Sequence, residues 1–180
     1  MRLVRTSQGV TLASVSRAEL LLLHLVAPTA DFTSSPELRR RFFPDPVSFA
    51  TDTDAARSIR EDWVEFALPQ IEQKLLEAQE TVRDDLEGAR PSKRRSSAPR
   101  APAQDTVSIP IPEAHGEAWY SALNQARLAL DYTKQNQPKA FHPGPEPMFQ
   151  GSPKFFLEIQ NAFYARIQTF LLETLLDRDS

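Results

Sequence analysis

A basic, proline-rich stretch at residues 88–104 divides the chain into two unequal parts. It reads GARPSKRRSSAPRAPAQ and contains five basic residues and no carboxylate. Gly, Pro and Ser fill most of its other positions, so it has too little apolar surface to offset the entropy lost on ordering. We therefore predict a single domain over residues 1–180 that carries a disordered insertion at residues 88–105.

The composition is that of an ordinary globular protein. The chain of 180 residues is 41% hydrophobic and 25% charged, which suits one domain with a substantial core. It has no cysteine, which excludes disulfides and thiolate metal sites and is compatible with a reducing compartment. The most apolar run, residues 20–26, is far shorter than the roughly 20 residues that cross a bilayer, and no signal-peptide pattern surrounds it. We expect a cytoplasmic protein without a membrane partner.

Apolar and polar residues alternate in two regions, as is typical of β-strands. Residues 3–5 and 10–12 flank a turn in which Gly9 can supply a positive φ, and this pattern predicts a hairpin. Because a two-stranded hairpin is marginal alone, we expect residues 107–111 to join it in a small antiparallel sheet. Pro110 has no backbone donor, which predicts an edge position for this strand.

Helix signals occupy most of the remaining sequence, and about five helices are expected to pack with the sheet. Ser16 and Glu19 have the spacing of a capping box, directly before the leucine run. Ser35 followed by Pro36 is a typical start for a short helix, which should end before Pro44. The fold class is therefore α+β and predominantly helical.

A longer helical segment follows, with either Asp52 or Asp54 as its N-cap. Pro69 removes one backbone donor within it, which predicts either one kinked helix or two helices in succession. The acidic residues of this segment, including Glu61, Asp62 and Glu65, are interpreted as a solvated face rather than as catalytic carboxylates. The segment between residues 54 and 87 is rich in acids, so carboxylate neighbours are unavoidable there.

Two amphipathic helices are expected to form the centre of the core. The first carries Trp119, Leu123, Ala126 and Leu130 at helical spacing and ends at Pro138, after which residues 136–152 form a Pro/Gly-rich loop. The last helix begins at residues 152–153. Its predicted inward stripe consists of Phe156, Ile159, Phe163, Ile167, Phe170 and Leu171. On this prediction, Phe163→Ala costs about 3–5 kcal/mol of stability, whereas deleting residues 89–104 costs little.

No motif for catalysis, cofactor binding or metal binding is present. The three histidines, His24, His115 and His142, have no His or Glu partner at metal-ligand spacing. His24 follows an apolar run and is interpreted as a core or boundary residue. Residues 51–54 alternate Thr and Asp, but Arg57 stands where a calcium loop of the EF-hand type requires glycine. We expect no cofactor and no bound metal.

The basic stretch offers the clearest candidates for an interaction. Residues 94–97 could be a phosphorylation site, and residues 93–95 could bind phosphate groups or serve as a nuclear signal. Alternatively, the basic charges only keep a linker soluble. Because the rest of the chain is acidic, we expect no general nucleic-acid-binding surface, and nucleic acid is not the expected partner. The candidate interaction residues are Arg90, Lys93, Arg94, Arg95 and Arg100.

Three residues of the helix after the sheet are candidates for structural or buried polar positions: Arg127, Trp119 and Asn124. Arg127 lies one turn from Leu123 and Leu130, near the inward stripe, which favours a structural salt bridge over catalysis. The sequence does not identify the acid that would pair with it.

Several stretches resemble a bacterial family of unknown function, the domain-of-unknown-function family numbered two thousand and seventeen. The resemblance covers nearly the whole chain apart from the basic stretch and the 136–152 loop, which look like insertions of this member. Pro69 also departs from the uninterrupted helix associated with the family. The matching stretches are residues 2–12, 18–21, 36–44, 118–124 and 126–130, together with the last helix.

The resemblance implies no established activity, cofactor or catalytic residue. In some genomes, members of the family are encoded near an adaptor of the Clp protease, which implies a regulatory or proteolysis-linked role. Our leading hypothesis is a non-enzymatic module for protein–protein interaction or regulation. Two alternatives stay open: an enzyme whose site assembles from Arg127, His24 and the acids near Trp63, and nucleic-acid binding through residues 90–100.

Overall fold

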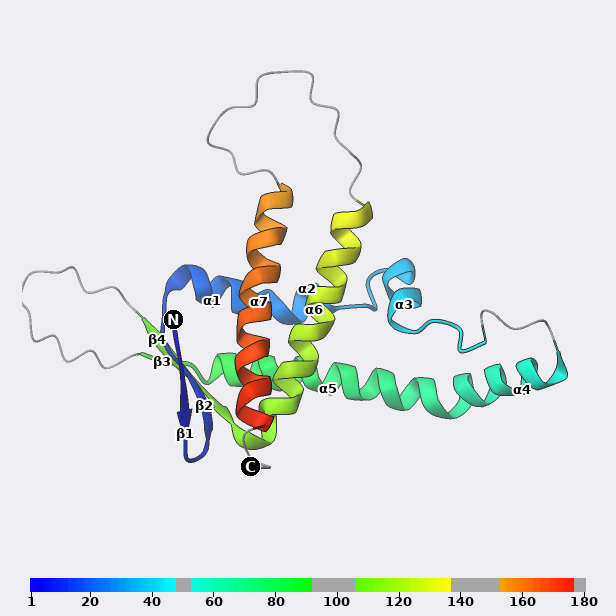
Figure 1. The fold of residues 1–180 in the computed structure, drawn as a ribbon, viewed down its shortest axis with the longest axis horizontal. Coiled ribbons are helices and arrows are strands. Elements are labelled where there is room, and N and C mark those ends of the chain that lie inside the picture. The colour runs from blue at the N-terminus through cyan, green and yellow to red at the C-terminus, as the bar shows by residue number, and fades with distance from the viewer. Residues whose placement is uncertain (48–52, 92–105, 137–152, 177–180) are drawn as a thin grey trace, which may run out of the picture.

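The structure, a computed structural model, describes residues 1–47, 53–91, 106–136 and 153–176 (Figure 1). It is a predominantly helical α+β fold in which a small antiparallel sheet packs with five helical units, which confirms the predicted fold class. Two of the units contain more than one segment. The units are α1 (Arg17–His24) with α2 (Val26–Ala30), α3 (Pro36–Phe42), α4 (Asp54–Asp62) with the π-helical turn η1 (Trp63–Ala67) and α5 (Leu68–Glu87), α6 (Gly116–Asn136), and α7 (Pro153–Leu176).

The sheet contains the predicted hairpin and the predicted third strand. Its four strands lie in the order β1-β2-β4-β3 and all pair antiparallel. Gly9 lies at the turn, where its φ of 134° is a backbone conformation that favours glycine. The strands are β1 (Arg2–Thr6), β2 (Gly9–Val15), β3 (Arg90–Pro91) and β4 (Val107–Pro112).

Two expectations about this sheet are wrong. β4 is not an edge strand, because β3 pairs with Val107 and Ser108 on the side away from β2. Because β3 pairs only with Val107 and Ser108, it does not extend as far as Pro110. The lack of a backbone N–H at Pro110 therefore costs no hydrogen bond to β3. Arg90 and Pro91, which were assigned to the disordered insertion, form β3 itself. Residues 92–105 lie outside the described residues.

Helix α1 begins with the predicted capping box. The Glu19 backbone N–H donates to Ser16 Oγ at 3.3 Å, and the Ser16 backbone N–H donates to Glu19 Oε2 at 2.8 Å. The ammonium of Met1 also donates to the Glu19 carboxylate, at 3.0 Å. Partial burial acts to raise the pKa of Glu19, but the hydrogen bonds from Ser16 and the charge of Met1 together hold this pKa below its ordinary value of 4.5.

Glu19→Gln is expected to lower the free energy of unfolding by about 1 kcal/mol at pH 7, because it weakens the capping box. A depressed folded-state pKa stabilises the fold above the unfolded-state value, and this stabilisation is lost as the pH falls through the folded-state pKa. The difference between wild type and variant should therefore shrink below about pH 4.5 in thermal melts. Glu61→Gln, at an exposed site, is the control. A difference that does not vary with pH would contradict this account.

The second helical unit is α3, which caps a small aromatic cluster. Ser35 is its N-cap and accepts a hydrogen bond from the Leu38 backbone N–H at 3.2 Å, and Pro36 occupies its first position, as predicted. The helix ends at Phe42, before Pro44. Phe32 packs against Phe42 and Phe43, with ring centroids 5.7 and 5.0 Å apart. This cluster joins the end of α2 to α3 and to α6.

The third unit runs without a break from Asp54 to Glu87. Its N-cap is Thr53, whose Oγ1 accepts from the Ala56 backbone N–H at 3.2 Å; Asp54 is in the first turn and does not cap, and Asp52 lies outside the described residues. The sequence left a kinked helix and two helices open. The structure has two successive α-helical segments, α4 and α5, joined by a π-helical turn before Pro69, and the Leu68 N–H donates to the Trp63 carbonyl five residues back. The wider turn accommodates the proline without ending the helix.

The core lies between the sheet and the helices, and α6 packs in it against α2, α5 and α7. Trp119, Leu123, Ala126 and Leu130 are buried, as their spacing predicted. The predicted stripe of α7 is only partly right. Ile167 and Leu171 are buried and Phe163 and Phe170 are half-buried.

Phe156 and Ile159 correct the predicted stripe of α7, because they are exposed. The buried face includes Tyr164, whose hydroxyl donates to the Leu22 carbonyl at 2.8 Å, and Gln160, whose amide donates to Tyr164 and to Thr29. Burial raises the pKa of Tyr164 to about 12. A pattern built from apolar residues alone missed this face, because the face also contains polar groups that find partners on α1 and α2.

Candidate functional site

Several exposed apolar side chains lie on residues 54–76, which we call the arm. The arm consists of α4, η1 and the first part of α5, and it extends away from the sheet and from α6 and α7 (Figure 1). Val64 and Phe66 are 60% and 57% exposed. The other exposed large apolar side chains of the arm are Ile59, Ile71 and Leu76.

The apolar stripe of the arm continues the stripe that α5 buries against the body. Ala78, Val82 and Leu86 are buried in the core, whereas the members of the stripe between residues 59 and 75 are half-buried or exposed. These members are Ile59, Trp63, Ala67, Ile71 and Leu75. A stripe of this kind normally faces a partner, because a helix in a soluble protein rarely leaves one in water.

Two ion pairs attach one edge of the arm to the body. Arg60 Nε donates to Asp45 at 2.9 Å, and Arg39 on α3 pairs with Glu72. The acids predicted to form a solvated face, Glu61, Asp62 and Glu65, are exposed. The arm therefore combines exposed apolar side chains with charged residues on its other faces.

Arg127 lies between α6 and α7 and is held by amide groups. Its Nε donates to Asn161 Oδ1 at 3.0 Å and its Nη1 to Gln168 Oε1 at 2.6 Å. Asn161 donates in turn to Asp131 at 3.1 Å. Arg127 is therefore connected to an acid, Asp131, through the Asn161 side chain and not by a direct ion pair. These hydrogen bonds join α6 to α7.

Trp119 is completely buried and reaches a carboxylate that the sequence did not single out. Its Nε1 donates to Asp85 Oδ2 at 2.8 Å, and His115 Nδ1 lies 3.0 Å from both oxygens of the same carboxylate. Asp85 thereby joins α5 to the start of α6. Within the described ranges, the hydrogen-bond partner of the His115 ring is the Asp85 carboxylate.

Asn124 is exposed, and its neighbour Gln125 is the buried polar residue of α6. Gln79 Nε2 donates to Gln125 Oε1 at 2.8 Å and to the Ala30 carbonyl at 3.2 Å, so the pair joins α2, α5 and α6. Among the described residues, no buried side-chain nitrogen or oxygen lacks a hydrogen-bond partner. No sequence motif marked Gln79 or Gln125, since long-range amide pairs have no fixed spacing.

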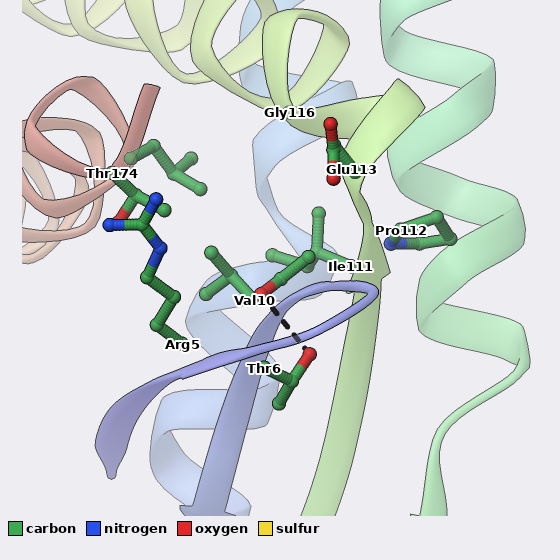
Figure 2. Close-up of a pocket in the computed structure, with 10 residues that line it drawn as sticks. Arg5, Thr6, Val10, Ile111, Pro112, Glu113, Gly116 and Thr174 are labelled. Atoms are coloured by element: carbon green, nitrogen blue, oxygen red, sulfur yellow. Dashed lines mark hydrogen bonds between the residues drawn. The ribbon is translucent and has the colours of Figure 1, made fainter. Parts of the chain in front are cut away.

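A small pocket lies between the β1–β2 turn, the end of β4 and the last helix (Figure 2). Its walls include Val10 and Ile111, and the Arg5 guanidinium extends along one side toward Thr174. Thr6 Oγ1 donates to the Gly9 carbonyl at 3.1 Å beside it. The lining contains one guanidinium, from Arg5, one carboxylate, from Glu113, and the hydroxyls of Thr6 and Thr174.

The residues proposed for a scattered enzyme site do not come together. His24 is exposed at the end of α1, so it is not a core residue, while Arg127 is engaged between α6 and α7 and Trp63 lies on the arm. Within the described ranges, no group of three or more His, Asp and Glu side chains could hold a metal ion.

A family comparison accounts for nearly all of the sequence. The family model described as "Domain of unknown function (DUF2017)" matches residues 3–177. The chain belongs to this family. No curated protein and no solved structure matches it. Membership of DUF2017 carries no assigned activity.

The basic candidates of this DUF2017 member can be placed only in part. Arg90 is exposed in β3, opposite Ser108. Lys93, Arg94, Arg95 and Arg100 lie outside the described residues, as does the predicted loop beyond Asn136. No helix among the described residues is both long and apolar enough to span a membrane.

Proposed function

We propose that this member of DUF2017 is a non-enzymatic module for protein–protein interaction, and that its docking surface is the arm. The observation that carries the proposal is the apolar stripe that is buried at Ala78 and Val82 and uncovered at Ile59 and Ile71. Burying an exposed apolar side chain gains free energy roughly in proportion to the area removed from water, about 25 cal/mol per Å². A partner that covers the arm gains this energy without displacing any part of the core.

The polar groups of the body support the same proposal. Arg127 and Trp119 make hydrogen bonds that join helices, and Gln79 donates a hydrogen bond to Gln125 inside the core. Side chains committed to such bonds serve stability. A regulatory role linked to proteolysis, implied by the family context, would suit a module of this kind, and the cysteine-free composition suits a cytoplasmic location.

Substitution of the arm is expected to abolish partner binding while leaving the fold intact. Val64→Ser with Phe66→Ser removes two exposed side chains, so the midpoint of thermal unfolding should change little. The tagged chain, recovered from native lysate, should carry a protein in stoichiometric amount, and the double variant should not. Leu128→Ser, which replaces an exposed leucine on α6, is the matched control and should retain the partner.

Two outcomes would contradict the proposal that the arm docks a protein partner. If no protein copurifies in stoichiometric amount and the purified chain turns over a compound in an untargeted metabolite screen, the module is an enzyme. Equal recovery of the partner by wild type and by the Val64/Phe66 variant would place the docking surface elsewhere.

A further inference from the structure

One edge of the arm carries a regular row of exposed residues. Asp62, Phe66, Gln70 and Lys74 recur every four residues and all are exposed. Four residues exceed one turn of an α-helix, so such a row would normally drift around the helix. The π-helical turn η1 contains more residues per turn and offsets this drift, which keeps the row along one side of the apolar stripe.

The charges at the two ends of this row have opposite signs and equal spacing from its centre. Asp62 and Lys74 both lie six residues from Leu68. Neither takes part in an ion pair within the described ranges, whereas Arg60 and Glu72 on the other edge are paired with the body. The row therefore forms the free edge of the arm, which remains available to a partner.

We propose that the arm pairs with the arm of a second copy of this chain, antiparallel, about a two-fold axis near Leu68. The inference rests on the proposed function, because it names the partner of the same surface. In this arrangement Asp62 of each copy faces Lys74 of the other, and Phe66 faces Gln70. Both contacts occur twice, as in any self-complementary two-fold interface.

The charge pattern distinguishes this arrangement from others. A parallel pair of arms would place Asp62 against Asp62 and Lys74 against Lys74. Like charges that face each other across two packed elements are destabilising. The antiparallel pair also apposes the two apolar stripes, so that Ile59 near one tip approaches the base of the other arm. A single pair of helices buries a modest area, which predicts a dimer that dissociates on dilution.

The first test is the molar mass in solution, measured by light scattering over a range of protein concentrations. The intact chain of 20.3 kDa is expected to reach twice this mass at high concentration and to return to the monomer on dilution. A monomer at every concentration up to about 1 mM, a thousandfold above a micromolar dissociation constant, would overturn the proposal.

Charge exchange tests the direction of pairing. Asp62→Lys and Lys74→Asp each create two like-charge contacts, and each is expected to raise the dissociation constant about tenfold at low salt. The double variant restores both pairs with reversed signs and should return to within about threefold of wild type. Glu65→Lys, which lies in neither the row nor the stripe, is the control. If the double variant is as weak as the single ones, Asp62 and Lys74 do not face each other.

A cysteine crosslink provides an independent readout, because the chain has no cysteine of its own. Ala67→Cys lies beside the axis and is expected to form a disulfide-linked dimer on mild oxidation. Asp54→Cys, at the tip of the arm, faces the other arm's base and should not crosslink to itself. Preferential crosslinking at Asp54 would indicate a different arrangement and would overturn the antiparallel pairing.

The pull-down with the Val64/Phe66 variant separates failure of this inference from failure of the proposed function. A monomeric wild type that still captures another protein through the arm, such as one with a basic amphipathic helix, removes the homodimer and keeps the docking surface. A monomer that captures nothing removes both.

Discussion

Replacing Trp119 with alanine is expected to lower the free energy of unfolding by about 3–5 kcal/mol. The side chain is completely buried among residues from the sheet and the helices, so its removal leaves a large cavity. The change also removes the indole donor of Asp85, whose carboxylate is only 11% exposed. Loss of a partner by a buried polar group adds to the cost. Because a domain of this size has a reserve of about 5–15 kcal/mol, the variant should be close to unfolding at 37 °C.

Urea unfolding followed by far-ultraviolet circular dichroism measures this effect without depending on tryptophan fluorescence. Phe66→Ala, on the exposed arm, is the control and should change the free energy of unfolding by about 0.5 kcal/mol or less in dilute solution. Phe163→Ala belongs between the two, at about 1–2 kcal/mol, because Phe163 is half-buried. If Phe163→Ala were the most damaging of the three, the assignment of Trp119 to the centre of the core would be wrong.

Gly9→Ala is expected to destabilise the fold by about 3 kcal/mol or more, through strain and overlap. A Cβ at position 9 would lie 2.3 Å from the Ile111 carbonyl oxygen and 2.6 Å from the Glu113 nitrogen. Both are backbone atoms, so no side-chain rotation relieves the overlap. The Glu113 nitrogen also donates to the Gln8 carbonyl at 2.9 Å, and a displaced β4 would lose this bond. The positive φ of 134° adds strain for any residue with a side chain.

Gly88→Ala provides a matched control for this prediction. Gly88 ends α5 with a negative φ, and a Cβ there would meet the Asp85 carbonyl oxygen at an ordinary contact distance of 3.4 Å. Its free energy of unfolding should stay within about 1 kcal/mol of wild type. Thermal melts of the two variants decide the matter, and equal effects would show that the turn at residue 9 tolerates a side chain.

Local signals in the sequence predicted much of the fold. The turn at Gly9, the capping box of Ser16 and Glu19, and the start of α3 at Ser35 each depend on a few neighbouring residues, so their geometry follows from short-range chemistry. The helical spacing of Trp119, Leu123 and Leu130 predicted the buried face of α6, because that face is almost entirely apolar.

The errors arose where tertiary contacts decide the outcome. The buried face of α7 includes Gln160 and Tyr164, which hydrogen-bond to α1 and α2 across more than a hundred residues of sequence. β4 lies inside the sheet because the two-residue β3 pairs with it, and no pattern of two residues predicts a strand. Thr53 replaced the expected aspartates as N-cap, since all three residues are good caps and the sequence does not distinguish them.

The candidate surface was hidden for a related reason. Ile59, Trp63 and Ile71 have the spacing of core residues, and the sequence alone does not show that the helix runs past the body. The π-helical turn before Pro69 keeps these side chains in one stripe, and the sequence does not distinguish such a turn from the kinked helix or the two successive helices that Pro69 predicts. Burial of Gln79 and Gln125 likewise depends on helices that meet only in the folded chain.

The pairing of β3 with β4 has a consequence for how this chain can change in length. The chain leaves the sheet at Pro91 and returns at Val107, and these two residues face each other in the ladder. The sheet therefore fixes the distance between the two ends of the intervening sequence, however many residues that sequence contains. The entropic cost of closing this loop rises only with the logarithm of its number of residues. Evolution can lengthen, shorten or rewrite the sequence between them without disturbing the core, and the same position can accept an inserted reporter domain whose termini lie close together.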